Sequence, residues 1–155
     1  MGETSIYASI SGAHTFGRAR CIFIVDRLNN FSNTGQPDPT LDTTYLQVLQ
    51  KQCPRNGSGT HVFFDQTTPI RMDNKFYSNL QVKKGLLQSD QELFSTSGAD
   101  TIGIVNSFAK NETIFFQNFR NSMIKMSKIG VRTGTQGEIR KHCNFVNKVS
   151  SELNY

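Results

Sequence analysis

The spacing of apolar residues constrains this chain most, because in segment after segment it follows the period of an amphipathic helix. In the first clear case the apolar side chains are Cys21, Ile24, Val25 and Leu28. Asp42 is a suitable N-cap for a second helix over residues 43–52. That helix is expected to stop near Cys53, because Pro54 cannot continue it.

The second half of the chain carries similar helix signals. A capping box formed by Ser89 and Glu92 predicts a helix that starts at Asp90. Asp73 is expected to cap a shorter helix before it, and the longest helix is expected over residues 113–129. Strands are at most short, and the chain contains no internal repeat and no linker. These patterns predict one mainly α domain, or part of one, over residues 1–155.

Composition and charge limit the functional classes to which this chain can belong. The chain has 155 residues, a formal net charge of +5 and a pI near 9.3. Its basic residues are scattered in runs of two at most, so we expect no nucleic-acid partner. No stretch approaches the ~18 apolar residues of a membrane span. The first residues show no signal peptide.

The cysteine count is odd, with Cys21, Cys53 and Cys143. No CxxC pair is present, which argues against a zinc site. In an oxidising compartment two of the three could pair, and the partner of the third would lie on another chain or on a part of the protein that is absent. Three glycosylation sequons fit a secretory context. They begin at Asn30, Asn56 and Asn111.

Residues 11–21, SGAHTFGRARC, form the most specific segment of the chain. They resemble the proximal haem motif of the plant secretory (class III) haem peroxidases. The resemblance continues in order through DRLNNFSNTGQPDPTLDTTYLQ, CP, FDQTTPIRMDNKFY, KGLLQSDQELF and GTQGEIRKHC. Since it covers nearly the whole chain, it implies the haem-peroxidase fold. Within that fold it implies the proximal helical half, with at most a short two-stranded β element.

The resemblance assigns His14 as the axial ligand of the iron in haem b, a role that suits a neutral imidazole nitrogen. Asp90 would accept the other ring N–H, which orients the ligand and makes it more electron-rich. Phe64 would pack against the imidazole, and Phe23 would lie near the exposed haem edge, where aromatic donors approach. The plainer alternatives are core packing for the two phenylalanines and helix capping for Asp90. The other two histidines have no such context.

The resemblance also implies a calcium site. Its matching residues are Thr15, Asp65, Thr68, Arg71 and Asp73. Calcium prefers several hard oxygens, so the aspartates would supply charge, the threonines hydroxyl and carbonyl oxygens, and Arg71 only its carbonyl. Because Thr15 adjoins His14, the ion would tie the backbone of the iron ligand to a distant loop. The alternative is that the two aspartates are solvated residues of a loop.

Other parts of the family pattern concern the cysteines and a missing half. By resemblance Cys21 and Cys53 form a disulfide, and the partner of Cys143 lies in an N-terminal half that is expected to be absent. The family's distal Arg, His and Asn and its second calcium site belong to that half, so they are expected to be absent as well. SIYASI at residues 5–10 also stands where the family usually has an Asp and an apolar run. Half a haem pocket is expected to expose a large apolar surface.

The function implied by the resemblance is that of a haem peroxidase, which reduces hydrogen peroxide and oxidises phenolic donors by one electron each, in response to oxidative stress. Such a protein would be secreted, to the cell wall or vacuole, and would be a monomer when intact. Two alternatives stay open. One is a catalytically inactive fragment that binds haem and calcium, and the other is a basic interaction module without a cofactor.

Overall fold

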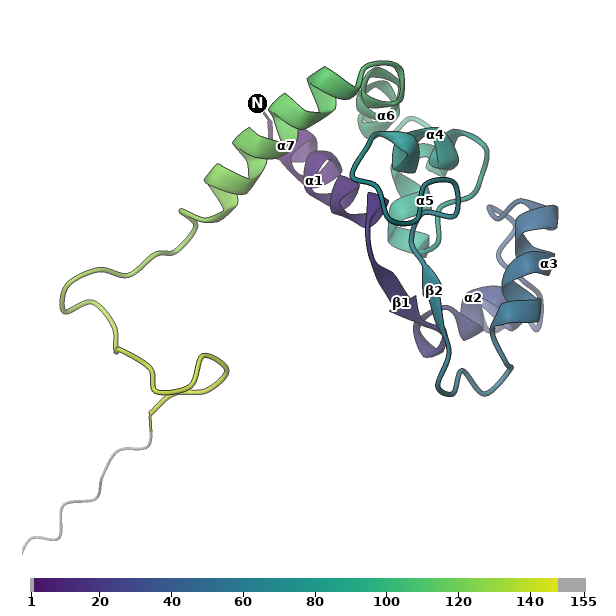
Figure 1. The fold of residues 1–155 in the computed structure, drawn as a ribbon, viewed down its shortest axis with the longest axis horizontal. Coiled ribbons are helices and arrows are strands. Elements are labelled where there is room, and N and C mark those ends of the chain that lie inside the picture. The colour runs from purple at the N-terminus through teal and green to yellow at the C-terminus, as the bar shows by residue number, and fades with distance from the viewer. Residues whose placement is uncertain (1, 148–155) are drawn as a thin grey trace, which may run out of the picture.

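A computed structural model describes residues 2–147, and Figure 1 shows their arrangement. Within these residues it contains seven α-helices and one two-stranded antiparallel sheet. The helices are α1 (Glu3–Ser11), α2 (Val25–Asn29), α3 (Thr43–Gln52), α4 (Lys75–Gln81), α5 (Gln88–Ser95), α6 (Thr101–Lys110) and α7 (Glu112–Met126). The strands are β1 (Arg18–Arg20) and β2 (His61–Phe63). The prediction of a mainly helical chain with a short two-stranded element is confirmed.

The described chain forms two lobes joined by the β1–β2 ribbon (Figure 1). The helical lobe consists of α1, α4, α5, α6 and α7, and its buried cluster is rich in aromatic rings. These rings are Phe76, Tyr77, Phe108 and Phe115. The disulfide lobe consists of α2, α3 and the ribbon, and its cluster is mainly aliphatic. It includes Ile24, Leu28, Leu49 and Val62. The two lobes therefore have separate hydrophobic cores, and the residues between the lobes pack against both.

Tyr77 ties the helices of the helical lobe together. Its hydroxyl donates to the Ala8 carbonyl at 2.9 Å, and its ring meets Phe115 edge-on with centroids 5.1 Å apart. Burial, with the negative charge of Asp90, raises the pKa of Tyr77, so its hydroxyl remains a donor. Gly12 follows α1 at this point, and a Cβ there would collide with the Tyr77 hydroxyl and the Phe115 ring. Only glycine lets the end of α1 pack this closely.

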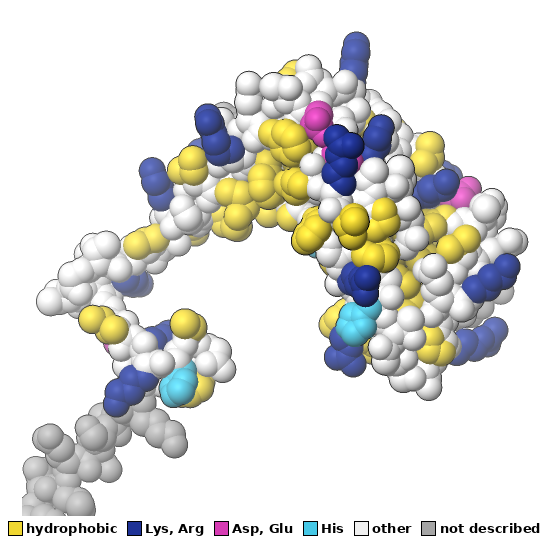
Figure 2. All heavy atoms as spheres, viewed as in Figure 1, with side chains coloured by type: hydrophobic (Ala, Val, Ile, Leu, Met, Phe, Trp, Pro, Cys, Tyr) yellow, Lys and Arg dark blue, Asp and Glu magenta, His cyan; other side chains and the backbone are white. Residues whose placement is uncertain are grey.

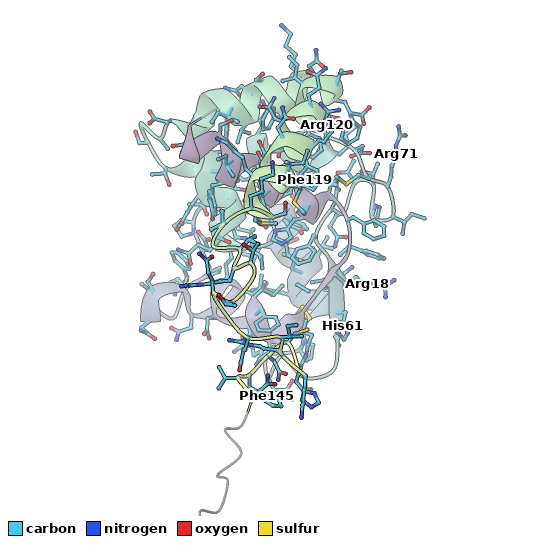
Figure 3. All side chains as sticks on the ribbon, turned by 90° about the vertical axis from the view of Figure 1, so that its left-hand side faces the viewer. Arg18, His61, Arg71, Phe119, Arg120 and Phe145 are labelled. Carbon is cyan, nitrogen blue, oxygen red and sulfur yellow. A yellow bond between two sulfur atoms is a disulfide. The ribbon has the colours of Figure 1, made fainter. Side chains whose placement is uncertain are left out.

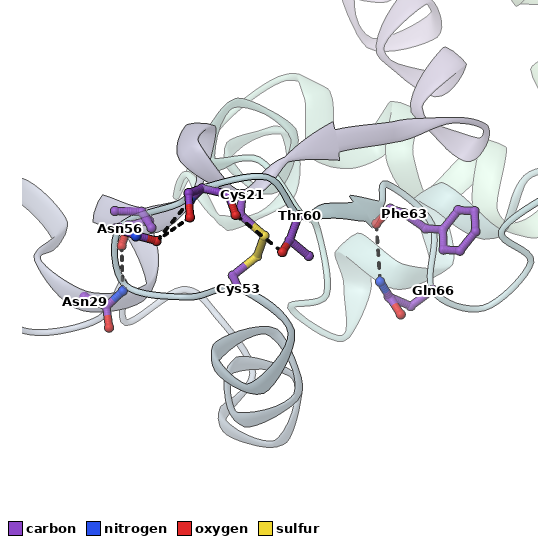
Figure 4. The surroundings of a disulfide bond; sticks show 9 residues. Cys21, Asn29, Cys53, Asn56, Thr60, Phe63 and Gln66 are labelled. Atoms are coloured by element: carbon purple, nitrogen blue, oxygen red, sulfur yellow. Dashed lines mark hydrogen bonds between the residues drawn. A yellow bond between two sulfur atoms is a disulfide. The ribbon is translucent and has the colours of Figure 1, made fainter.

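The Cys21–Cys53 disulfide joins the segment after β1 to the end of α3, which confirms the expected pairing (Figure 4). The Cys21 N–H also donates to the Thr60 carbonyl at 2.9 Å. These two links hold Cys21–Phe23 in a 3₁₀ turn, and α2 begins only at Val25. The helix expected over this segment is therefore wrong in its first turn.

A buried ion pair fixes the backbone ahead of α5. Arg27 Nε donates to Asp38 Oδ2 at 2.7 Å, and its Nη1 donates to the carbonyls of Gly85 and Leu86. Although burial alone would raise the pKa of Asp38, hydrogen bonds from Arg27 and Thr40 hold it below its usual value. The charged pair thus anchors residues 85–86, which lead directly into the helix that carries Asp90.

Two predicted helix starts have different outcomes. Asp42 caps α3 as expected, because its carboxylate accepts the Tyr45 N–H at 2.9 Å. The capping box at Ser89 is wrong, since α5 already begins at Gln88 and Asp90 lies inside its first turn. Arg27 holds the carbonyls of residues 85–86 just before α5, and no local sequence pattern reports these tertiary hydrogen bonds.

One face of α7 is not covered by the described chain. Phe115 and Ser122 are buried, whereas other side chains of the helix are exposed. The exposed apolar ones are Ile114, Phe116, Met123, Ile124 and Met126. Figure 2 shows apolar side chains gathered along the concave side of the body beneath this helix. This exposure agrees with the expected large apolar surface.

No helix within residues 2–147 has the length and apolar character needed to cross a bilayer.

Candidate functional site

His14 lies in a short 3₁₀ turn, Gly12–Thr15, at the junction of the two lobes. Its side chain is 33% exposed. Gly17, just after it, has a φ of +98°, which favours glycine and turns the chain into β1. The backbone conformation on each side of His14 therefore depends on a glycine, and this conformation fixes the position of the imidazole.

Asp90 holds one nitrogen of this imidazole. Its two carboxylate oxygens lie 3.0 and 3.1 Å from His14 Nδ1, and its side chain is 3% exposed. An ionised carboxylate accepts the Nδ1–H, which leaves the lone pair on Nε2. Nε2 makes no hydrogen bond to any residue that the structure describes. A histidine oriented in this way is suited to bind a metal through Nε2.

Two aromatic rings limit the rotation of the imidazole. Phe64, directly after β2, stacks on it with centroids 4.1 Å apart and planes 13° apart. Phe76 of α4 meets it edge-on at 6.4 Å. The Phe64 N–H donates to the Gly17 carbonyl at 3.2 Å, so the stacking ring is tied to the same turn as the histidine. The expected contact between Phe64 and His14 is present in the structure.

Asp65 and Asp73 form a second polar cluster next to His14. The Thr68 hydroxyl lies 3.3 Å from Asp65 Oδ2 and 3.1 Å from Asp73 Oδ1. The Thr15 hydroxyl lies 3.3 Å from Asp73 Oδ1. Thr15 and both aspartates are at most 3% exposed. The structure thus gathers four of the five residues expected to bind calcium through their side chains or backbone.

The negative charge of this cluster has no buried cationic partner within residues 2–147. Asp65 Oδ1 accepts from Asn79 Nδ2, and Asp73 Oδ1 accepts the Lys75 N–H, each at 2.8 Å. Arg71 Nε lies 3.6 Å from Asp73 Oδ2, but the arginine side chain is 71% exposed (Figure 3). Two buried carboxylates this close destabilise each other unless a cation joins them.

Asp73 also contacts the start of α4. Asn74 occupies the N-cap position and makes no side-chain cap bond, while the Asp73 carboxylate accepts the backbone N–H of Lys75, the first residue of the helix. Among the described residues no three His, Cys, Asp or Glu side chains converge. A cation here would therefore need neutral oxygens from hydroxyls and carbonyls, and calcium accepts such ligands.

Phe23 lies in the 3₁₀ turn after β1 and is 71% exposed. It lines a pocket of about 650 Å³ between the ribbon and α5. Phe64, the ring that stacks on His14, lines the same pocket. The structure therefore places the pocket beside the histidine, with Phe23 away from the imidazole itself.

Cys143 is a free, exposed cysteine in the segment after α7, which extends away from the body (Figure 1). His142, beside it, stacks on Phe145 with ring centroids 4.9 Å apart. Neither His142 nor His61 contacts the imidazole of His14 among the described contacts. The two remaining histidines are thus separate from the candidate site.

Comparisons with known proteins give the family. A family model described as peroxidase matches residues 7–111. Peroxidase 15 of Ipomoea batatas is 60% identical over 140 residues, which are 90% of this chain and 43% of that protein. Two proteins of Arabidopsis thaliana are also similar: Peroxidase 54 is 54% identical over 150 residues, and Peroxidase 22 is 51% identical over 148. The chain belongs to the peroxidase family, within its plant class III branch.

The chain spans less than half the length of these relatives. It covers 43% of the Ipomoea protein and 42% of each of the two Arabidopsis proteins. The activity of a whole relative therefore does not transfer to this chain as it stands.

Sequence reasoning missed residues that position the site. Asn79 donates to Asp65 and accepts from Thr67 at 2.8 Å, and Arg27 fixes the approach to α5. A single asparagine on a helix has no recognisable motif. Arg27 and Asp38 are eleven residues apart, which is not a helical spacing. Only the folded chain brings these groups to their partners.

Proposed function

We propose that this chain is the proximal, haem-binding part of a plant secretory peroxidase, with His14 as the axial ligand of the iron in haem b. The observation that carries the proposal is the state of His14. Its Nδ1 is held by a buried carboxylate, one face is covered by Phe64, and its Nε2 is unpaired among the described residues. Haem iron takes an imidazole nitrogen as such a ligand.

Asp90 has two tasks in this proposal. Asp90 Oδ1 lies 3.0 Å from His14 Nδ1 and keeps the proton on that nitrogen. The lone pair of Nε2 therefore remains free to bind iron. Asp90 also makes the imidazole more electron-rich, which favours oxidised iron. Haem, when bound, supplies the redox chemistry that no protein side chain offers. Phe64 and Phe76 keep the ligand from turning.

The second part of the proposal is a calcium ion held by oxygens of Thr15, Asp65, Thr68 and Asp73, with the carbonyl of Arg71. Its support is that two buried carboxylates lie within hydrogen-bonding distance of one threonine hydroxyl and lack a buried cation among the described residues. Thr15 directly follows His14, so an ion at this place would stiffen the turn that presents the iron ligand.

The reaction of the complete fold would convert one hydrogen peroxide to two waters. Two phenolic molecules would each lose one electron and one proton from the hydroxyl, which balances the reduction. Phenols would approach near the exposed Phe23. Plant class III peroxidases are typically secreted, and we propose the cell wall or vacuole as the location, a role in oxidative stress, and a monomeric state.

This chain alone is proposed to have little turnover. Cleavage of peroxide needs acid–base groups on the face of haem opposite the iron ligand, and a positioned group contributes ~10²–10⁴-fold to a rate. His14 and Asp90 are linked to each other and would lie on the same side of the ring. An inactive chain that binds haem and calcium is the second candidate, and the uncovered apolar face of α7 favours it.

Reconstitution with haem tests the proposal. The chain should bind haem with a Soret band typical of histidine ligation and should turn over peroxide little faster than free haem–imidazole. A polypeptide equivalent to the remaining part of a relative, added in trans, should raise the rate. Turnover equal to that of an intact relative, from this chain alone, would contradict the inactive assignment, and absence of a Soret band would contradict the haem assignment.

A further inference from the structure

Gln91, the residue after Asp90, has a side chain that the proposed function does not use. It lies in α5 and is fully buried, although glutamine usually lies at the surface. Its Oε1 accepts the Gly85 N–H at 2.9 Å. Its Nε2 donates to the Leu80 carbonyl at 3.0 Å and to Ser95 Oγ at 2.7 Å. A buried amide that is bonded at both ends is costly to disturb, because its partners would be left unpaired.

The bond to Leu80 connects α5 to the end of α4. The two helices lie side by side in the helical lobe (Figure 1). Leu80 belongs to α4, the helix whose Phe76 meets the His14 ring edge-on. Gln91 therefore ties the helix that carries Asp90 to a helix that contacts the imidazole directly.

Gly85, the other partner, is held from both lobes. Its N–H is bound by Gln91, and its carbonyl accepts from Arg27 Nη1 at 2.7 Å. A Cβ at Gly85 would lie 2.7 Å from Leu80 Cδ2 and 3.0 Å from Gln91 Oε1, so a larger residue would displace the amide. The Arg27 side chain is itself bonded to Asp38. Gln91 and Arg27 together thus fix the segment just before α5.

The contact that depends on this segment has little tolerance. The Asp90 carboxylate reaches His14 from the first turn of α5, with its oxygens 3.0 and 3.1 Å from Nδ1. At a distance of about 3.6 Å such a contact is no longer a hydrogen bond. A shift of the first turn by about 0.5 Å is therefore enough to lose it. Gln91 is the next residue along the same turn, so its bonds control that shift.

We infer that Gln91 is a positioning residue for the iron ligand, a role that rests on the proposed function of His14. Its amide keeps the first turn of α5 at the distance at which Asp90 accepts the His14 Nδ1–H. The lone pair of the imidazole then stays on Nε2. Gln91 makes no hydrogen bond to the imidazole within residues 2–147, and it acts through Asp90.

Nitrogen-15 NMR of the chain without haem tests the inference, because the shifts of the two ring nitrogens report which one carries the proton. At a pH where the imidazole is neutral, the unmodified chain should hold the proton of His14 on Nδ1. Gln91→Met keeps the length of the side chain and removes its hydrogen bonds. It should lower the ratio of the Nδ1–H to the Nε2–H tautomer by about fivefold. Ser95→Ala removes one bond of the three and should lower the ratio less.

Gln50→Met is the matched control. It removes a glutamine bond to a backbone carbonyl, that of Leu28, in the disulfide lobe, and it should leave the tautomer ratio of His14 unchanged. If Gln91→Met lowers the free energy of unfolding but keeps the ratio, Gln91 is only structural and the inference is wrong. If Gln91→Met does not fold, an unchanged ratio in Ser95→Ala overturns the inference.

A double-mutant cycle with haem separates positioning from a direct effect on iron. Gln91→Met should raise the redox potential in the same direction as Asp90→Asn, but by less. Added to Asp90→Asn, it should cause no further shift, because Gln91 acts through that carboxylate. Additive shifts would overturn the inference. Failure to bind haem would refute the iron-ligand proposal, whereas the tautomer ratio of the haem-free chain would still decide the role of Gln91.

Discussion

The two polar clusters beside residues 14–15 differ in the partners that they offer to buried carboxylates. Asp90 is 2% exposed and faces the imidazole N–H of His14, a partner within the chain. Asp65 and Asp73 are just as buried, at 1% and 3%, but face hydroxyls, an amide and backbone N–H groups. Burial alone therefore does not distinguish the roles of these acids. The partner does, because the second cluster has no buried cation among the described residues, and the exposed Arg71 is 3.6 Å from Asp73.

The two clusters nevertheless share one scaffold. The turn that presents His14 to Asp90 presents the next residue, Thr15, to Asp73. The segment after β2 likewise places Phe64 on the imidazole and the next residue, Asp65, in the other cluster. A change at one cluster should therefore reach the other through a single peptide bond.

The largest expected effect is the loss of haem binding in His14→Ala. This variant removes the only imidazole held by Asp90, so the Soret band of ligated haem should disappear or become that of loosely bound haem. His142→Ala is the matched control, since His142 lies in the exposed segment after α7. Calcium binding should be unchanged in His142→Ala. Equal spectra for the two variants would contradict the assignment of His14.

Removal of the Cys21–Cys53 disulfide tests the scaffold that the two clusters share. The bond closes a loop with a sequence separation of 32 residues, so Cys21→Ser/Cys53→Ser should lower the free energy of unfolding by about 3–4 kcal/mol. Both variant and reference carry Cys143→Ser, to exclude exchange with the free thiol. Denaturant titration measures the loss. Peptide mapping of the unmodified chain should find Cys143 unpaired, and a Cys143 bridge to either cysteine would contradict the pairing.

Calcium should stabilise the Asp65–Asp73 cluster, which has no buried cation among the described residues. At calcium concentrations near 100 times Kd, the free energy of unfolding should rise by about 2.7 kcal/mol. Asp65→Asn/Asp73→Asn should abolish this dependence and should not destabilise the calcium-free protein, because the repulsion is removed with the charges. Thermal unfolding with calcium and with a chelator measures both.

The control for the calcium experiment is Asp26→Asn/Asp100→Asn, which removes two exposed carboxylates. It should keep the full response to calcium. If the unmodified protein melts at the same temperature with calcium and chelator, the ion does not bind at the Asp65–Asp73 cluster.

The smallest expected effect is that of Asp90→Asn. The amide can still accept the Nδ1–H, so haem should stay bound, but the negative charge is lost. Changes to a residue that hydrogen-bonds a metal ligand shift affinity by about 10–100-fold, and a loss of this size that falls on ferric haem alone corresponds to about 60–120 mV for a one-electron couple. Redox titration should show a potential raised by this amount. An unchanged potential would mean that Asp90 orients His14 without tuning iron.

Several elements could be predicted from the sequence because their causes are local. The Asp42 cap and the end of α3 before Pro54 follow from contacts within one turn. The extended resemblance to class III peroxidases also indicated His14 and Asp90, 76 residues apart, and the structure places them 3.0 Å from each other. It likewise indicated the pairing of Cys21 with Cys53.

Tertiary structure alone decided the rest. Whether a buried carboxylate has a charged partner depends on which segments meet, and residues such as Asn79 and Arg27 reach theirs across eleven or more positions. The start of α5 and the 3₁₀ turn at Cys21 are set by hydrogen bonds and a covalent link to distant segments, which override local helix preference. The sequence by itself determined helical periods and residue chemistry. The fold decided which of these groups share a low-dielectric environment, and there the free energy of each charge depends on its neighbours.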